Sequence, residues 1–187
     1  FQDPPPCTRF GKLSLALMIT ELTEDRGRNI VILKLVKDIV KTTRQVLVLS
    51  DRRHHCEVMH QSFKKTSGLY MGGMKEADLT ESSKKQIIFA TFSQAHEGLD
   101  IPTLDTVILA TPKSDIVQSI GRIMRETKGK KNNPHIYDIF DQWSICHAMY
   151  KKRLKVYKQG GFHIPILNSQ KNEDETPFKK GECFINI

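Results

Sequence analysis

The sequence of 187 residues lacks the long apolar runs and paired cysteines that would place it at a membrane or outside the cell. No apolar segment approaches the roughly 20 residues that a membrane-spanning helix requires. The N-terminal FQDPPPCTRF has no apolar core of the signal-peptide kind. We therefore expect no membrane partner and reduced thiols in an intracellular protein. The four scattered cysteines, none in a CxxC pair, are Cys7, Cys56, Cys146 and Cys183.

The standard motifs for binding a nucleoside triphosphate are also missing. No GxxxxGKS/T phosphate loop occurs, because Gly11-Lys12 is followed by Leu13 and has no suitable glycine upstream. No strand ends in a DEAD, DEAH or DExH box that could hold magnesium and water. The chain also has no initiating methionine. We therefore expect a fragment of a longer protein that cannot hold a nucleoside triphosphate in the standard way by itself.

The composition that remains is that of a foldable, basic domain. Hydrophobic residues make up 39% of the chain, which is enough to bury a core. The formal net charge is +8 and the pI is near 9.3. This balance suits a polyanionic partner such as nucleic acid, although many basic domains are simply soluble.

Short apolar runs alternate with helical segments along most of the chain. The alternation predicts βαβ units and an α/β fold, in which helices flank a parallel sheet on both faces. Asn29 is the expected cap of a buried helix over Ile30–Val40, and a last helix should start near Trp143. The expected strands are Gln45–Ser50, Ser67–Gly73, Gln86–Thr91, Thr106–Thr111 and His135–Phe140.

The chain divides into three expected parts. Residues 1–28 should connect to a missing preceding domain, and residues 29–167 should form the domain proper. Residues 168–187 read as a polar tail, whose final CFINI is a candidate edge strand. Ligands of parallel sheets meet the carboxyl ends of the strands, so chemistry is expected just after each predicted strand.

The stretch QSIGRIMRE predicts a short helix with two arginines on one side. At about 100° per residue, Gln118, Arg122 and Arg125 line one narrow face, and isoleucines lie nearly opposite. Two guanidinium groups on a rigid face suit a phosphate. Gly121 costs a helix about 1 kcal/mol, which a close approach of a ligand or a facing domain would offset. On spacing alone, surface arginines on a solvated face are the commoner explanation.

A second stretch, FATFSQAHEGLDIP, follows a predicted strand. Thr91 and Ser93 offer hydroxyls, Gly98 permits close contact, and Asp100 offers a carboxylate. Such a loop could hold a phosphate backbone on one side and a ribose on the other. An ordinary loop with a turn glycine would look the same.

Two further strand ends offer groups for anions. In LSDRRHHCEVMH, Ser50 and Arg52 stand at a helix N-terminus, whose free N–H groups favour anions. In YMGGMKE, Gly72 and Gly73 could bring backbone N–H groups to a phosphate, although a simple turn explains them equally well.

The sequence evidence for two possible metal sites is weaker. His54, His55, Cys56 and His60 cluster in the sequence without a second ligand pair, so we expect solvated histidines rather than zinc ligands. Asp138 and Asp141 could suggest a metal-dependent nuclease. We favour Asp138 as a strand residue and Asp141 as the cap of the last helix.

Taken in this order, three of these stretches resemble the second RecA-like motor domain of a superfamily 2 helicase. LVLSDR resembles motif IV, FATFSQAHEGLDIP resembles motif V, and QSIGRIMR resembles motif VI. The resemblance covers roughly residues 29–162. Within the superfamily, this stretch is most similar to helicases of phages and large cytoplasmic DNA viruses. Ile123-Met124 departs from the DEAD-box version of motif VI.

The resemblance implies a role for each matching residue. Arg122 and Arg125 match the catalytic arginine fingers that stabilise charge on the transferring γ-phosphoryl group. Residues implied to lie near the nucleotide are Gln118, Gly98 and Asp100. Residues implied to contact the nucleic-acid backbone are Ser50, Arg52, Gly72, Gly73 and Thr91.

The resemblance further implies an ATP-dependent helicase in the full-length protein. ATP and Mg would be held mainly by an N-terminal RecA-like domain, so this fragment alone should be inactive. The phage and viral likeness favours DNA over RNA and, if the protein is viral, the cytoplasm of an infected cell. A double-strand translocase or remodeller, or a nucleic-acid-binding module without motor activity, remain the alternatives.

Overall fold

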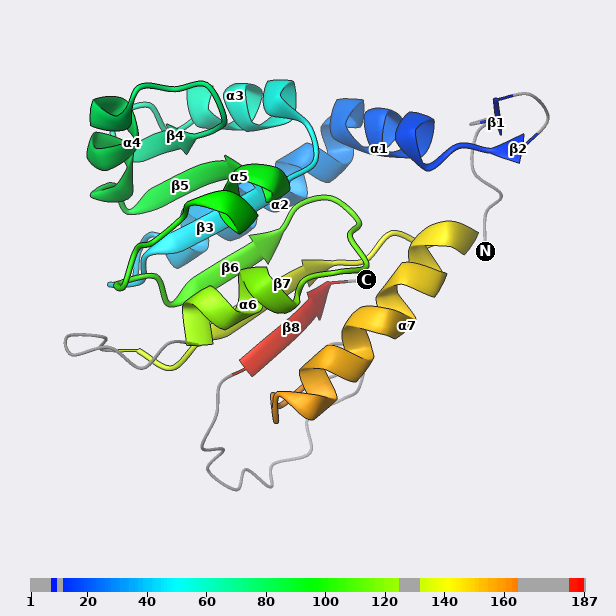
Figure 1. Ribbon diagram of the computed structural model, residues 1–187. Helices are drawn as coiled ribbons and strands as arrows, with labels where there is room; N and C mark the ends of the chain where they lie inside the picture. The colour runs from blue at the N-terminus through cyan, green and yellow to red at the C-terminus, as the bar shows by residue number, and fades with distance from the viewer. Residues whose placement is uncertain (1–7, 10–11, 125–131, 165–181, 187) are drawn as a thin grey trace.

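The computed structural model describes residues 8–9, 12–124, 132–164 and 182–186, and the side chains of residues 12–121 and 132–164. One sheet of six parallel strands forms its centre, which confirms the α/β prediction (Figure 1). In spatial order the strands are β4 (Ser67–Tyr70), β5 (Ile87–Thr91), β3 (Val46–Ser50), β6 (Thr106–Leu109), β7 (His135–Ile139) and β8 (Glu182–Asn186).

The edge strand β8, over residues 182–186, overlaps the CFINI segment and pairs in parallel with β7. A separate antiparallel pair, β1 (Thr8–Arg9) and β2 (Lys12–Leu13), precedes the first helix. None of the helices in the described part of the chain is long and apolar enough to cross a membrane.

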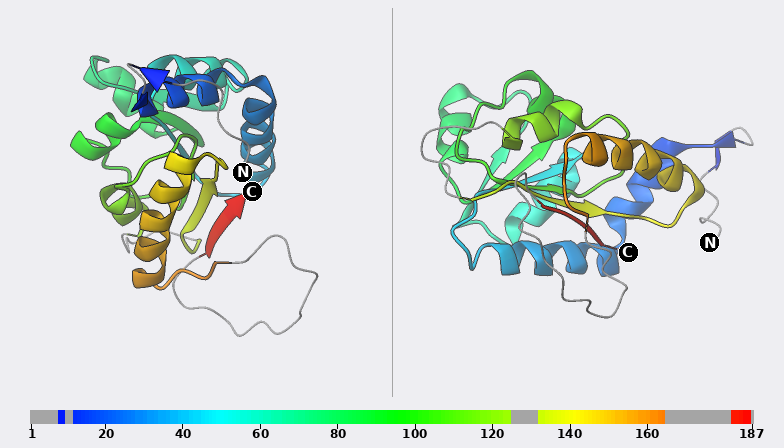
Figure 2. Two further views of the ribbon diagram at one scale, coloured as in Figure 1. Left: turned by 90° about the vertical axis from the view of Figure 1, so that its right-hand side faces the viewer. Right: turned by 90° about the horizontal axis from the view of Figure 1, so that it is seen from below.

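Helices cover both faces of the sheet, as expected for this fold (Figure 2). One face carries α2 (Arg26–Ile39) and α3 (Arg53–Gln61). The other carries α4 (Glu76–Ser83), α5 (Phe92–Glu97), α6 (Val117–Met124) and α7 (Ser144–Gln159). A further helix, α1 (Leu15–Glu24), packs Met18 and Leu22 against Cys146 at the start of α7.

Alternation along the central strands supplies both layers of the core. In β3, Leu47 and Leu49 face the helices α5–α7, and Val46 and Val48 face α2 and α3. All five residues of β3 are buried. A strand buried on both faces has a continuous apolar sequence rather than an alternating one. This is why VLVLS could be recognised as a central parallel strand.

The N-terminal helices differ from the prediction. Asp25, not Asn29, caps α2, because its carboxylate accepts a hydrogen bond from the Arg28 backbone N–H at 3.1 Å. The helix buries one face only, and Ile30 and Val31 are 52% and 44% exposed. The boundary placed after residue 28 falls inside α2, while the connection to another domain stays a prediction.

Candidate functional site

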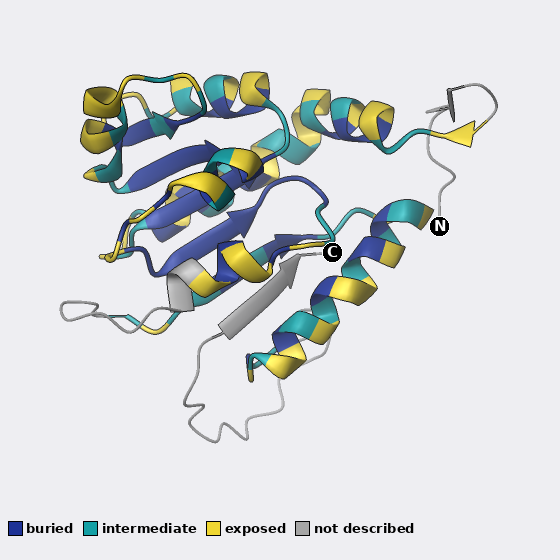
Figure 3. Ribbon diagram, viewed as in Figure 1, coloured by how far each residue is buried: buried dark blue, intermediate teal, exposed yellow. Residues whose placement is uncertain are grey.

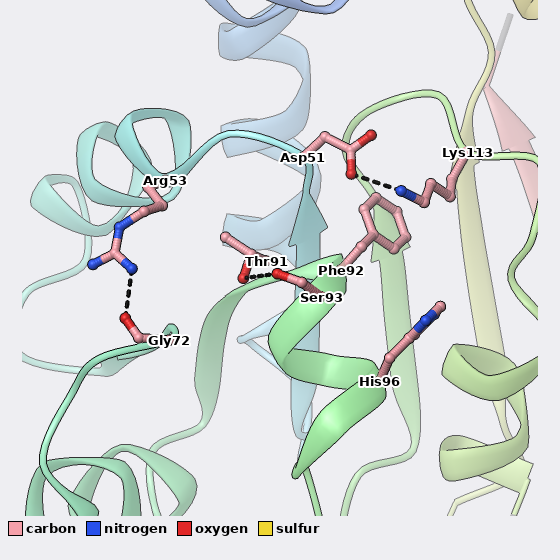
Figure 4. A pocket seen from close by; sticks show the side chains of 8 residues that line it. All are labelled: Asp51, Arg53, Gly72, Thr91, Phe92, Ser93, His96 and Lys113. Atoms are coloured by element: carbon pink, nitrogen blue, oxygen red, sulfur yellow. Dashed lines mark hydrogen bonds and ion pairs between the residues drawn. The ribbon is translucent and has the colours of Figure 1, made fainter.

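A cleft of about 290 Å³ opens where the central strands end (Figure 4). Four of the strands, β3, β4, β5 and β6, contribute residues at or after their carboxyl ends, where ligands of parallel sheets bind. The lining residues are Asp51 after β3, Arg53 at the start of α3, Gly72 after β4, Thr91, Phe92, Ser93 and His96 around the start of α5, and Lys113 after β6.

Polar contacts across the cleft leave it suited to an anion. The Lys113 ammonium donates to Asp51 Oδ1 at 2.9 Å and lies 5.3 Å from the centre of the Phe92 ring. Arg53 Nη1 donates to the Gly72 carbonyl at 2.5 Å. Lys113 thus neutralises the one carboxylate of the lining, and the exposed guanidinium of Arg53 adds a further positive charge.

Of the predicted backbone contacts, the structure brings Gly72 and Thr91 into the cleft. Thr91 Oγ1 lies 3.2 Å from Ser93 Oγ, so two hydroxyls meet at the start of α5. Gly73 is exposed in the adjoining turn with φ of +79°, a conformation that favours glycine. The conformation of the turn accounts for the glycine at position 73. The space beside Gly73 is also open enough for a ligand to approach.

Ser50 and Arg52 do not face the cleft. The Ser50 side chain is buried, accepts a hydrogen bond from the Arg52 backbone N–H at 3.1 Å, and lies 2.9 Å from His55 Nδ1. Arg52 Nη2 donates to the Ala16 carbonyl of α1 at 2.7 Å. Both residues therefore hold the β3–α3 loop in place, and the structure does not support their prediction as direct phosphate contacts.

The prediction of solvated histidines is wrong for His55. This ring is 3% exposed, and its Nε2 lies 2.9 Å from Asn29 Oδ1. Burial, with Arg28 and then His54 adding to it, lowers the pKa of His55 to about 4, so the ring is neutral at pH 7. Burial also raises the pKa of the Cys56 thiol to about 12. In the described part of the chain, no group of three or more metal-ligating side chains gathers.

The sequence prediction missed Arg53 and Lys113. Arg53 was passed over for its neighbour Arg52, and Lys113 lies in the loop after β6. The rule that ligands meet strand ends already pointed to that loop, so Lys113 could have been found from it.

The motif V-like loop presents two of its predicted nucleotide residues outward. Leu99 and Ile101 are buried in the core, and Gly98 and Asp100 between and beside them are exposed. The Tyr70 hydroxyl donates to the Gly98 carbonyl at 3.1 Å, which fixes the end of α5. The buried side chains of Leu99 and Ile101 therefore fix the loop so that Gly98 and Asp100 lie at the surface.

The helix α6 is anchored in the same way. Ile116 and Ile120 are buried in the core cluster that also holds Leu99, and Gln118 and Gly121 are exposed. A Cβ at Gly121 would meet nothing within 4 Å, so this side of the helix is open. The backbone of Arg122 lies in α6, but its side chain and all of Arg125 lie outside the described residues.

The two aspartates considered for a nuclease each bind an arginine instead. Asp138 is 1% exposed and accepts from Arg153 at 2.7 and 2.9 Å. Asp141 accepts from Arg28 at 2.7 and 2.9 Å, and Trp143 occupies the N-cap of α7. Asp141 as a helix cap is therefore wrong, and the two carboxylates share no site.

A comparison of the sequence with known protein families identifies the domain. The model of the helicase conserved C-terminal domain matches residues 18–127, which is more than half of the chain. The chain belongs to this family, as a superfamily 2 helicase C-terminal domain. This confirms the resemblance carried by motifs IV, V and VI.

Relatives of this helicase domain occur in large DNA viruses. A protein of Acanthamoeba polyphaga mimivirus, named as an ATP-dependent RNA helicase, is 37% identical over 144 residues, which cover 74% of this chain and 27% of the relative. A similarly named protein of African swine fever virus is 23% identical over 151 residues, covering 75% and 29%. The chain thus spans less than a third of these two relatives.

Among solved structures, phage T4 UvsW superposes with a TM-score of 0.62 at 20% identity, covering 80% of this chain and 36% of that one. At this identity the likeness shows the fold alone. It agrees with the RecA-like arrangement of helices around the parallel sheet.

One short helix lies between the cleft and the motif V-like loop. The six-residue α5 begins at the cleft with Phe92 and Ser93, and Gly98 of that loop is its C-terminal cap. Six residues of helix rise only about 9 Å. The helix also contacts α6, which carries the motif VI-like stretch. The cleft, the motif V-like loop and α6 are therefore packed close together.

Proposed function

We propose that this domain is the second motor domain of an ATP-dependent helicase that acts on RNA. The observation that carries the proposal is the shared anchoring of the motif V loop and α6. Gly98, Asp100 and Gln118 are exposed, while the apolar residues beside them enter one core cluster. Two elements in contact, α5 with the loop after it and α6, thereby present polar groups at the surface, and α5 begins at the cleft.

In this proposal Arg122 and Arg125 act as arginine fingers. They stabilise the negative charge that develops on the γ-phosphoryl group during its transfer. Gly121 leaves the outer side of α6 open to a close approach. Gln118, Gly98 and Asp100 would line that approach, on an open surface rather than in an enclosed pocket. ATP and Mg would be held mainly by the preceding RecA-like domain.

The cleft at the strand ends is the proposed grip on the nucleic-acid backbone. Arg53 supplies positive charge, Thr91 and Ser93 supply hydroxyls, and the turn at Gly72 supplies backbone groups. Contacts of this kind recognise phosphates rather than bases, so binding should depend on salt and little on sequence. The names of both viral relatives specify RNA, which favours RNA over the DNA expected from the phage likeness.

Replacement of Arg125 by alanine in the full-length protein tests the arginine fingers. We expect ATP hydrolysis to fall by about 10³-fold or more, because one finger stabilises the transition state and not bound ATP. ATP affinity, measured with a fluorescent analogue, should change little. Arg122→Ala should behave alike, and Arg26→Ala, an exposed arginine of α2, is the matched control. Unchanged turnover in both finger variants would contradict the assignment.

A further inference from the structure

The outward face of α7 carries four lysines, none of which belongs to the cleft or to motif VI. All four are exposed, and Figure 3 shows exposed residues along the outer side of this helix. At about 100° per residue they fall within an arc of about 120°, opposite the buried residues of the helix. The lysines are Lys151, Lys152, Lys155 and Lys158, and the buried residues are Cys146, Met149, Arg153 and Tyr157.

Among the residues that the structure describes, none forms an ion pair with these four charges. The sequence of α7, SICHAMYKKRLKVYKQ, contains no acidic residue. Elsewhere the pattern differs, because Lys84 and Lys85 both pair with Glu81. Like charges three and four residues apart destabilise a helix. A polyanion bound along this face would remove that repulsion.

The lysine face is tied structurally to the cleft. The helix α7 follows β7 and therefore starts at the edge of the sheet where the cleft lies, then runs back along the sheet (Figure 1). The buried Arg153 of α7 donates from Nη1 to the Lys113 carbonyl at 2.8 Å. Its guanidinium is held by Asp138, which also accepts from the Tyr157 hydroxyl at 2.7 Å. This network fixes the lysine face relative to a lining residue of the cleft.

We propose that the lysine face of α7 is a second binding surface for the same nucleic-acid strand that the cleft holds. The inference rests on the proposed grip of the cleft on RNA. Lysine ammonium groups act as point charges toward phosphates and require no particular base. A strand that leaves the cleft past Lys113 would run over α7, so the surface should lengthen the binding site without adding sequence preference.

Simultaneous replacement of the four lysines by alanine in the full-length protein tests this surface. Binding is measured by fluorescence anisotropy with single-stranded RNA of increasing length, at several salt concentrations. A strand just long enough for the cleft should bind as tightly as to the wild type. A long strand should bind at least tenfold more weakly, and its plot of log K against log salt should flatten by up to about 3 units, which is 0.7 for each of four phosphates.

A matched control removes the same charge from the opposite face of the sheet. Lys34, Lys37, Lys64 and Lys65 are exposed on or next to α2 and α3, and their replacement also lowers the formal net charge of +8 by four. This control should retain most of the long-strand affinity, because its charges lie away from the proposed path. Thermal unfolding of both variants checks that the fold is retained.

The outcomes separate this inference from the proposed function. If the α7 variant and the control lose equal affinity for long RNA, or if the α7 variant loses short RNA as well, the second surface is wrong. If the wild type binds neither length, the proposed grip of the cleft fails. If the wild type binds both and only the α7 variant loses the long strand with a flatter salt dependence, the lysine face is confirmed.

Discussion

Both edges of the sheet are rich in polar side chains, yet the two edges use them in opposite ways. At the carboxyl edge lies the cleft of about 290 Å³ already described. At the amino edge, before the strands begin, lies a larger hollow of about 410 Å³. Its lining residues are Thr43, Arg44, Gln45, Lys84, Gln86, Thr103, Asp105 and Asn132.

Side chains of the amino edge form their hydrogen bonds with other groups of the protein. The two N–H groups of the Gln86 amide are shared among the carbonyls of Val40, Thr42 and Arg44, which lie 3.0–3.3 Å from Nε2. Gln45 donates to the carbonyls of Ser83 and Lys85 at 2.8 and 2.9 Å. These bonds join loops that precede different strands, so they act as cross-links of the sheet.

At the carboxyl edge the polar groups are fewer, and they form fewer hydrogen bonds to the rest of the protein. Arg53 is exposed, and Thr91 and Ser93 bond chiefly to each other. A polar group whose partners lie within the protein contributes to stability, whereas one that faces a cleft can exchange water for a ligand. The larger hollow is thus the less suitable binding site, and the state of its hydrogen bonds decides this more than its size.

The largest expected effect on stability lies at the amino edge. Asp105 is 3% exposed and accepts from Thr106 Oγ1 at 2.8 Å and from Asn132 Nδ2 at 2.7 Å, with Arg44 Nη1 at 3.8 Å. Asp105→Ala removes the acceptor of Thr106 and Asn132 and the ion pair with Arg44, and should lower the free energy of unfolding by about 3 kcal/mol, as measured in urea. Asp105→Asn, which keeps an acceptor, should cost less. RNA affinity measured below the transition should not change, and a selective loss of affinity would break the contrast between the edges.

Each edge also holds one histidine whose protonated form is disfavoured by the fold. Burial, followed by Arg44, lowers the pKa of His135 at the start of β7 to about 4, as burial does for His55 below the carboxyl edge. A pKa below the ordinary 6.5 means that the fold favours the neutral ring. The stabilisation is therefore complete above about pH 6.5 and is lost as the pH falls toward 4.

The pH dependence can be divided between the two edges. For the buried His55, lowering the pH from 7 to 5 should remove about 2 kcal/mol of stability, since each unit below 6.5 costs about 1.4 kcal/mol. His135 is more exposed and should contribute less. Chemical unfolding of His55→Gln and His135→Gln from pH 7.5 to 5 measures both shares. A pH profile unchanged by His55→Gln would show that its ring is not held neutral.

Sequence reasoning located the sheet because local composition decides it. Central strands such as Val46–Ser50 are apolar throughout, and no other element requires that pattern at such a short length. Because the strands were expected to be parallel, their carboxyl ends were expected to share one edge. Thr91, which ends β5, and Gly72, two residues after β4, lie at that edge.

The remaining residues depend on contacts between distant segments, which composition does not reveal. Arg28 binds Asp141, 113 positions further along the chain, so neither residue's role could be read locally. Asn29 looked like a helix cap until α1, with Asp25 after it, supplied the true start of α2. Arg52 and Arg53 look alike in sequence, and only the packing of α1 decides which of them faces the cleft.

These adjacent arginines give the finest test of the contrast between binding and structural groups. Arg53→Ala removes an exposed cleft cation whose side chain donates to the Gly72 carbonyl, so it should change stability by less than about 0.5 kcal/mol. Its RNA affinity should fall about tenfold, near 1.4 kcal/mol, and the salt dependence should flatten by about 0.7. Anisotropy titrations at three salt concentrations measure both quantities.

Arg52→Ala is the matched partner, because it removes the same charge one residue away. It loses the bond from Nη2 to the Ala16 carbonyl, so we expect about 1 kcal/mol less stability and nearly unchanged RNA affinity. The reverse result, with Arg52→Ala weakening binding and Arg53→Ala weakening the fold, would restore the assignment made from sequence. It would mean that α1 leaves Arg52 when nucleic acid binds, because the guanidinium cannot hold the Ala16 carbonyl and a phosphate in the cleft with the same geometry.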